Sequence, residues 1–321
     1  MRLRLVPDET HWDFMQWRNY TFGASVVAMV ASLLIWLVMG LNFGIDFLGG
    51  TTIRTESSQA VDVGAYRAAL EPLALGDVAI TEVFDPTFAA DQNVSQIRIQ
   101  AQEGAEAVTP ETIATVEAAL QQVDPSIAFP SVESVGPKVS GELIVTALIA
   151  VGASLAAILF YIWLRFEWQF SVGAIAALVH DVVLTIGVFS LLQIRFDLAT
   201  IAAILTIIGY SINDTVVIFD RLRENLIKYK KQPLIDVMNR SVNETLSRTL
   251  MTSGTTIIAL LALLILGGDV IRGFVFAILW GVIVGTYSSV YVAKNVVLML
   301  GVDREPKKPS DAGTQFADID A

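Results

Sequence analysis

Six long apolar segments constrain the fold of this chain more than any other feature of its sequence. They lie at about residues 21–41, 142–164, 169–191, 198–219, 248–267 and 273–297. Each segment is long enough to cross about 30 Å of hydrocarbon as a helix. A bilayer core offers no hydrogen-bonding partner to the backbone, so single segments of this kind cross it as α-helices. We therefore predict a polytopic α-helical membrane protein with six transmembrane helices.

The composition supports a membrane protein and excludes several kinds of site. Charged residues make up 17% of the chain, against about 25% in soluble domains. The chain has no cysteine, which excludes disulfides and thiolate metal ligands. Its two histidines, His11 and His180, are far apart and argue against a zinc site. We therefore expect neither a metal nor an organic cofactor. No dense basic face is present, so we do not expect a nucleic-acid partner either.

The distribution of lysine and arginine predicts the orientation. With the N-terminus inside, 15 basic residues, Lys294 among them, lie on the cytoplasmic side or at helix ends there, and 6 lie outside. We therefore expect both termini to be cytoplasmic, as residues 1–20 and as a polar, disordered tail over 300–321. The stretch near 220–247 is expected as a cytoplasmic loop. It is interpreted either as a segment lying on anionic lipid or as a docking surface for a cytosolic partner.

Residues 42–140 are then a domain on the outer side of the membrane. The pattern predicts strands near 51–56, 78–83, 94–100 and 127–135, and helices near 61–70 and 110–122. Thr109 is the expected cap of the second helix, with Pro110 as its first residue. The order strand, helix, strand, strand, helix, strand is that of an α+β ferredoxin-like (βαββαβ) domain. Gly44, the pair 49–50 and the pair 136–137 join it to the membrane part and are candidate hinges.

Asp214 is the most unusual residue of the apolar segments. A carboxylate at the centre of a bilayer costs roughly 2.5–3.5 kcal/mol by insertion scales, so such residues are rare and usually functional. Protonation is the simplest way to remove the charge, which makes Asp214 a candidate proton acceptor. The alternative is a neutral, hydrogen-bonded aspartic acid that only holds helices together.

Helical spacing adds further polar residues to the same segment. Thr206, Tyr210 and the pair Asn213 and Asp214 lie on one side of a helix. A hydroxyl, a phenol and a carboxylate along such a stripe can pass protons or hold water. For Thr206 and the neighbouring Ser211, ordinary hydrogen bonding between helices is the favoured alternative, and Asn213 can serve the same purpose.

Two more segments contribute candidate residues. Asp181 lies near the middle of the third segment, where it is either a proton relay or a structural partner, and His180 beside it is better explained by packing. Arg248 opens the fifth segment, close in depth to Asp214. It is interpreted either as a partner that approaches and leaves Asp214 or as a side chain that extends to the membrane surface.

Several motifs resemble those of a known family, the SecF branch of the SecD/SecF protein-export family in the resistance-nodulation-cell division superfamily. The motifs are GIDFLGGT at 44–51, VGPKVS at 135–140, ALVHD at 177–181, GYSINDTVV at 209–217 and SRTLMTSGTT at 247–256. The resemblance covers essentially residues 1–300, and the motif at 209–217 is the most specific.

The resemblance implies a role in protein export. It implies that Asp214 and Arg248 belong to a proton pathway, with protons as the coupling ion of the bacterial inner membrane. It also implies a partner, SecD, docking to the SecY-E-G channel and contact with unfolded polypeptide during late translocation. Two alternatives remain from the residues alone: a subunit of a small-molecule/proton antiporter, or a structural scaffold of an export complex, which needs no buried aspartate.

Overall fold

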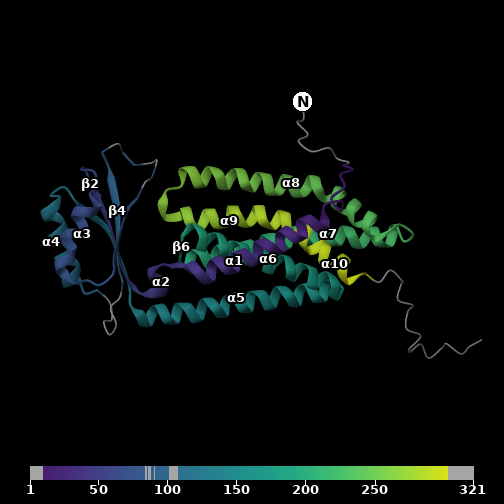
Figure 1. Cartoon of the computed structure of the whole chain (residues 1–321), viewed down its shortest axis with the longest axis horizontal. Helices are drawn as coiled ribbons and strands as arrows, with labels where there is room; N and C mark the ends of the chain where they lie inside the picture. Colours follow the sequence, from purple (N-terminus) through teal and green to yellow (C-terminus); the bar gives the residue numbers. More distant parts are fainter. Residues whose placement is uncertain (1–9, 84, 86–87, 90, 101–107, 303–321) are drawn as a thin grey trace, which may run out of the picture.

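A bundle of long helices and a small sheet domain lie end to end in the computed structural model of the chain (Figure 1). The structure describes residues 10–83, 85, 88–89, 91–100 and 108–302. Six helical spans in this part of the chain are long and apolar enough to cross a membrane, as predicted. They are α1 (Arg18–Met39), α5 (Pro137–Arg165), α6 (Trp168–Leu192), α7 (Leu198–Lys228), α8 (Leu234–Leu266) and a sixth span beginning with α9 (Asp269–Ser288).

Two features of the spans differ from the expectation. The sixth span is not one regular helix: a π-helical turn, Ser289–Ala293, joins α9 to α10 (Lys294–Leu300). In addition, α7 and α8 have 31 and 33 residues, or about 46 and 50 Å at 1.5 Å per residue. Residues 220–247, expected as a loop, are therefore helical except for the short turn at 229–233. Both helices continue beyond the length that a bilayer requires.

The buried side chains of the bundle lie mainly on α6, α7 and the sixth span, while α1, α5 and α8 expose much of their apolar surface. Small residues allow the inner helices to approach closely. A Cβ on Gly281 of α9 would overlap the side chain of Ile207 on α7, and a Cβ on Gly187 of α6 would overlap Ser32 on α1. The centre of the bundle is therefore built on close contacts between backbones.

The sheet domain has the predicted order of elements. These are β2 (Gly50–Ser57), α3 (Val63–Leu70), β3 (Val78–Val83), β4 (Asn93–Gln100), α4 (Pro110–Val123) and β5 (Ala128–Val135), with a short 3₁₀ turn at Glu71–Leu73. The sheet order is β3-β4-β2-β5, and every neighbouring pair is antiparallel. The Thr109 cap is confirmed by a 3.2 Å hydrogen bond from the Thr112 amide to Thr109 Oγ1.

The core of this domain lies between the sheet and its two helices. Ile53 of β2 is paired with Ile97 of β4, and both pack against Tyr66 of α3 and Leu120 of α4. The helices lie on the side of the sheet away from the bundle (Figure 1). Alternate residues of a strand point to opposite faces, so the polar face that carries Arg98 is turned toward the bundle.

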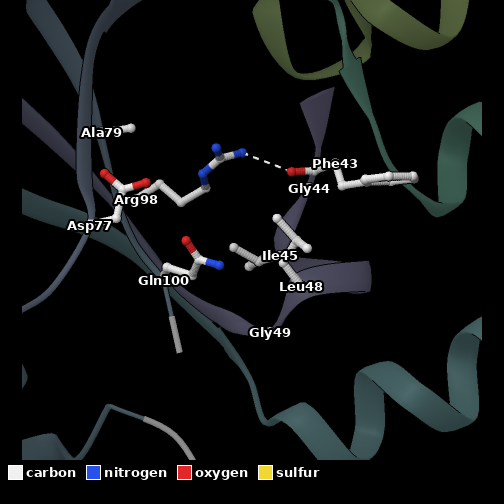
Figure 2. Close-up of a pocket in the computed structure, with 9 residues that line it drawn as sticks. All are labelled: Phe43, Gly44, Ile45, Leu48, Gly49, Asp77, Ala79, Arg98 and Gln100. Atoms are coloured by element: carbon white, nitrogen blue, oxygen red, sulfur yellow. Dashed lines mark hydrogen bonds between the residues drawn. The ribbon is translucent and has the colours of Figure 1, made fainter. Parts of the chain in front are cut away.

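A short joint connects the two parts. Residues of β1 (Asn42–Phe43) pair in parallel with β6 (Arg195–Phe196), the strand between α6 and α7. A small helix, α2 (Ile45–Leu48), follows β1 in the chain. Arg98 of β4 reaches across to this joint and donates a 3.0 Å hydrogen bond from Nη1 to the Phe43 carbonyl (Figure 2). Gly49 and Gly50, at the end of α2, have φ of 71° and 128°, which other residues adopt only with strain.

Candidate functional site: two buried carboxylates

The helix α7 places Asp214 inside the bundle. Its start is fixed by a capping box in which Asp197 Oδ1 accepts from the Thr200 amide at 2.9 Å. From there Ile207, Ser211, Asp214 and Ile218 recur at intervals of three or four residues, and all are buried. The helix therefore turns one otherwise apolar ridge into the bundle with a hydroxyl and a carboxylate in its middle.

Asp214 accepts from a hydroxyl of α8, which in turn contacts a hydroxyl of α9. Asp214 is 4% exposed. Its Oδ2 accepts a 3.5 Å hydrogen bond from Ser253 Oγ of α8. Ser253 Oγ lies 2.7 Å from Thr286 Oγ1 of α9 and accepts a 3.4 Å bond from the Tyr210 hydroxyl. The Asp214 cluster is thus Asp214, Tyr210, Ser253 and Thr286, at the meeting point of α7, α8 and α9.

Asp181 of α6 lies at the centre of a second polar cluster. Asp181 is 1% exposed. Oδ2 accepts hydrogen bonds from Ser211 Oγ at 2.6 Å and from Ser288 Oγ at 2.8 Å, and Oδ1 lies 2.9 Å from His180 Nδ1. The Asp181 cluster is therefore Asp181, His180, Ser211 and Ser288, and it joins α6, α7 and α9.

The His180 ring extends the Asp181 cluster toward α1. It is fully buried and stacks on the Tyr287 ring, with 6.0 Å between centroids. The Tyr287 hydroxyl donates a 2.8 Å hydrogen bond to the Thr21 carbonyl and lies 3.0 Å from Ser25 Oγ. Among the described residues, His180 Nε2 has no hydrogen-bonding partner.

The two clusters are neighbours. Ser211 and Asp214 are about one helical turn apart on α7, and Thr286 and Ser288 are two residues apart on α9. Gly285 of α9 leaves room for the Asp181 cluster: a Cβ there would lie 3.1 Å from Ser211 Cβ and 3.5 Å from Asp181 Oδ2. Both clusters therefore lie along the contact between α7 and α9.

Three of the predicted site residues lie outside both clusters: Thr206, Asn213 and Arg248. Thr206 is exposed, and its hydroxyl donates to the Ala202 carbonyl of its own helix at 2.8 Å. Asn213 is also exposed. The structure does bring Tyr210, Ser211 and Asp214 to the interior.

Arg248 lies on α8 five residues before Ser253, or about 7.5 Å along the helix. It is exposed, and it is close enough for its charge to act on Asp214. The described part of the chain shows no ion pair between them. Within the described ranges, the hydrogen bond to the Asp214 side chain comes from the Ser253 hydroxyl, with the guanidinium nearby.

The partner residues Thr286, Tyr287 and Ser288 were not among the predicted site residues. Serine, threonine and tyrosine are common in membrane helices as ordinary contacts. The small-residue spacing of Gly281 and Gly285 was a usable signal, because it marks the face of the sixth span that approaches another helix.

The arrangement is suited to proton binding. An ionised aspartate only accepts hydrogen bonds, whereas the acid also donates one, and hydroxyls can serve either form by rotating. Among the described residues, no group of three or more histidine, cysteine or acidic side chains gathers in a way that could hold a metal.

Comparison with family models gives two matches. Residues 115–303 match the description "Protein export membrane protein SecD/SecF, C-terminal", and residues 34–61 match "SecD/SecF GG Motif". The protein translocase subunit SecF of Cereibacter sphaeroides is 69% identical over 321 residues, with 100% of this chain and 99% of the relative covered. The subunit of the same name from Rickettsia felis is 40% identical over 308 residues, covering 95% and 97%.

Solved structures are also similar. The crystal structure of SecDF from Thermus thermophilus, described as a translocon-associated membrane protein, matches with a TM-score of 0.82 and 36% identity. A SecDF crystal structure in a super-membrane-facing form matches with a TM-score of 0.68 and 37% identity. The matches cover 94% and 93% of this chain, but only 40% of each SecDF chain.

Proposed function

The chain belongs to the SecD/SecF family of protein-export membrane proteins, within its SecF branch, and on this premise we propose that it uses the proton motive force to promote late steps of protein translocation through the Sec channel. It is a multi-pass inner-membrane protein of protein transport. The coupling ion in this proposal is the proton, and no cofactor takes part.

The observation that carries the proposal is the setting of Asp214. The carboxyl group is buried in the middle of a long apolar helix, and the described chain gives it one hydroxyl partner, Ser253, but no paired cation. A charge that is unpaired in a membrane interior is costly, and binding a proton removes that cost. The site therefore favours an Asp214 carboxyl group that binds and releases a proton.

In the proposed cycle, Asp214 takes up a proton and changes its hydrogen bonds. Ionised, it requires donors from Ser253 and attracts the Arg248 guanidinium; protonated, it no longer holds the cation and can itself donate. Each state favours a different position of α8 relative to α7. The close contacts at Gly281 and Gly285 then pass this change to the sixth span and to the Asp181 cluster.

The proposed topology places both termini in the cytoplasm and residues 42–140 in the periplasm. It is supported by the basic residues at the bundle end away from the sheet, including Arg165, Arg221 and Arg240, which the positive-inside rule assigns to the cytoplasm. The strand order and antiparallel pairing support a ferredoxin-like, split βαβ description of the outer domain.

The proposed partners follow from the family. SecD, as a separate chain, corresponds to the part of the longer SecDF chains that this one does not cover. The SecY-E-G channel and the translocating unfolded polypeptide complete the assembly, and membrane lipid covers the remaining apolar surface. In this assembly the outer domain moves relative to the bundle at the joint near Phe43 and handles the emerging polypeptide.

Asp214→Asn tests the proposal, because asparagine keeps the shape and hydrogen bonds but cannot be ionised. The variant should still assemble with SecD. Inner-membrane vesicles that carry it should lose the proton-gradient-driven stimulation of export. The matched control is Asp220→Asn, which removes a partly exposed carboxylate, paired with Arg165, from the same helix. Full stimulation with Asp214→Asn would favour the scaffold, and gradient-driven uptake of a small solute without any effect on export would favour an antiporter.

A further inference from the structure

Lys294 is a buried amine that the Asp214 and Asp181 clusters do not use. It is the first residue of α10, after the π-helical turn, at the bundle end away from the sheet (Figure 1). The residue is 1% exposed, and no described acceptor lies within hydrogen-bonding distance of Nζ. No described carboxylate forms an ion pair with it. A buried ammonium without an acceptor is among the costliest arrangements in a protein.

A segment before the first helix covers Lys294. We call residues 10–17 the lid; they form neither helix nor strand and lead directly into α1. The Phe14 ring lies over Lys294, with 5.9 Å from Nζ to the ring centroid. Met15, the next residue of the lid, is 4% exposed and belongs to the apolar core of the bundle. The lid therefore separates the amine from water.

Two asparagines on α8 hold the lid through its backbone. Asn243 accepts from the Trp12 amide at 2.9 Å and donates to the Trp12 carbonyl at 2.8 Å. Asn239 Oδ1 accepts from the Phe14 amide, also at 2.9 Å. Asn239 and Asn243 are four residues apart, so they lie on one face of α8. These bonds hold the lid against α8.

The charged and titratable groups around Lys294 are few. The charge of Asp13, on the lid itself, reaches the amine, but Asp13 Oδ1 already accepts from the amides of Met15 and Gln16 at 3.1 Å each. Tyr291 precedes Lys294 on the sixth span and contacts both Tyr287 and Phe14, with centroids 5.2 and 6.3 Å away. Because Tyr287 stacks on His180, a line of side chains joins the Asp181 cluster to Lys294.

Water has access to the outer edge of the lid. A cavity of about 540 Å³ opens there between the lid and the ends of α7 and α8. Its lining includes Thr10 and His11 of the lid, Arg221 of α7, and Asn239 and Asn243 of α8. The cavity reaches both asparagines that hold the lid, so lifting the lid would open Lys294 to this water.

From these contacts we propose that Lys294 is a second proton-binding residue of the chain, whose protonation is coupled to the position of the lid. With the lid docked, the amine is uncharged and sealed beneath Phe14. With the lid lifted, the amine meets water in the cavity and takes a proton from it, and docking returns that proton. Applied to transport, this inference rests on the proposed function, since it adds a proton-dependent gate at the bundle end away from the outer domain.

Cysteine labelling of the lid tests the coupling, because the chain has no cysteine of its own. Met15→Cys, buried in the docked lid, reports lid opening through its labelling rate with a membrane-impermeant maleimide in inside-out vesicles. Gln16→Cys, which is exposed, serves as the control thiol. Lys294→Met should slow labelling of residue 15 several-fold, because no charge opposes docking. Lys294→Arg should accelerate it several-fold, since arginine does not lose its proton in proteins.

Asn239→Ala with Asn243→Ala should accelerate labelling whatever occupies position 294. This double variant loosens the lid while leaving Lys294 unchanged. Thermal unfolding checks that all variants fold. Equal labelling rates for lysine, methionine and arginine at position 294 would overturn the proposal. The labelling needs neither a proton gradient nor export, so failure of the Asp214→Asn test would remove the proposed function and leave the lid result standing.

Discussion

Gly281 on α9 and Ile207 on α7 lie so close together that the isoleucine side chain fills the space a Cβ on residue 281 would need. This contact is one turn from Gly285, where Ser211 and Asp181 meet the same helix. The separation of α7 and α9 therefore sets the position of Asp214 on α7 and of the two hydroxyls, Ser211 and Ser288, that Asp181 accepts from. A change in that separation acts on both clusters at once.

Gly281→Ala should destabilise the bundle by about 1–3 kcal/mol, the usual cost of overpacking a well-packed core. The contacting atoms belong to a buried isoleucine that has little room to move. The measurement is thermal unfolding in detergent. Gly273→Ala is the control on the same helix, since its Cβ would meet Ile194 Cγ2 at an ordinary 3.6 Å. Equal melting temperatures for both variants would show that the helices separate easily.

Asp124 of the outer domain should make stability depend on pH. Burial raises the pKa of its carboxyl, but hydrogen bonds from Ser57 and Ser126 outweigh burial and hold the pKa below its ordinary 3.8. The stabilisation is thus complete above about pH 4 and is lost as the pH falls through the lower, folded-state pKa. At neutral pH, Asp124→Asn should cost about 1.5–3 kcal/mol, as for hydrogen bonds to charged groups.

Thermal unfolding from pH 7 downward checks this expectation. The difference in melting temperature between the wild type and Asp124→Asn should narrow once the pH falls below about 4. The control Glu82→Gln, at an exposed carboxylate on β3, should melt at the wild-type temperature at neutral pH. A difference that stays constant down to the acid limit would argue that Asp124 stabilises the domain without its charge.

Arg248→Lys should impair proton-driven export. Lysine keeps the charge but cannot reproduce the planar guanidinium fork that pairs with a carboxylate. Export by the single variants and by the double variant with Asp214→Asn decides whether the residues act together. Coupled residues give a double variant no worse than Asp214→Asn alone, whereas strictly additive losses would mean independent roles. Near-normal export with lysine would indicate that Arg248 only extends to the membrane surface.

The motion of the outer domain can be tested at the joint. Arg195 Nη1 lies 3.5 Å from Gln96 Oε1, across the gap between bundle and sheet. Cysteines at these two positions, bridged by a short reducible crosslinker, should block gradient-stimulated export, and reductant should restore it. A control pair at Thr51 and Ser134, whose hydroxyls are 2.8 Å apart within the sheet, should have no effect. Unimpaired export with the first bridge complete would mean that the domain does not need to move.

Much of this architecture could be predicted from the sequence, because apolar length and helical or alternating periodicity are local signals. The six spans and the order of the outer domain follow from them. Asp214 and Asp181 stood out because a carboxylate is conspicuous among apolar residues. The joint was only partly predictable: its glycines indicated turns, but the pairing of β1 with β6 links residues about 150 positions apart.

The site residues that were misplaced or missed have a common cause. Thr206 and Asn213 lie on the ridge next to the buried one, and a one-residue choice of ridge rotates the face by 100°. Which ridge is buried depends on the close approach of α9 at Gly281. Lys294 reads from the sequence as one more basic residue near a cytoplasmic helix end. Its burial depends on the lid and the π-helical turn, neither of which has a local signal.

Infrared difference spectroscopy of the protein in membranes tests the central claim, that Asp214 binds and releases a proton, most directly. A protonated carboxyl group gives a C=O stretching band that an ionised one lacks. The account predicts a band that appears on acidification, disappears on return to alkaline pH, is absent in Asp214→Asn and persists in Asp220→Asn. A spectrum in which Asp214→Asn retains every pH-dependent carboxyl band of the wild type would contradict it.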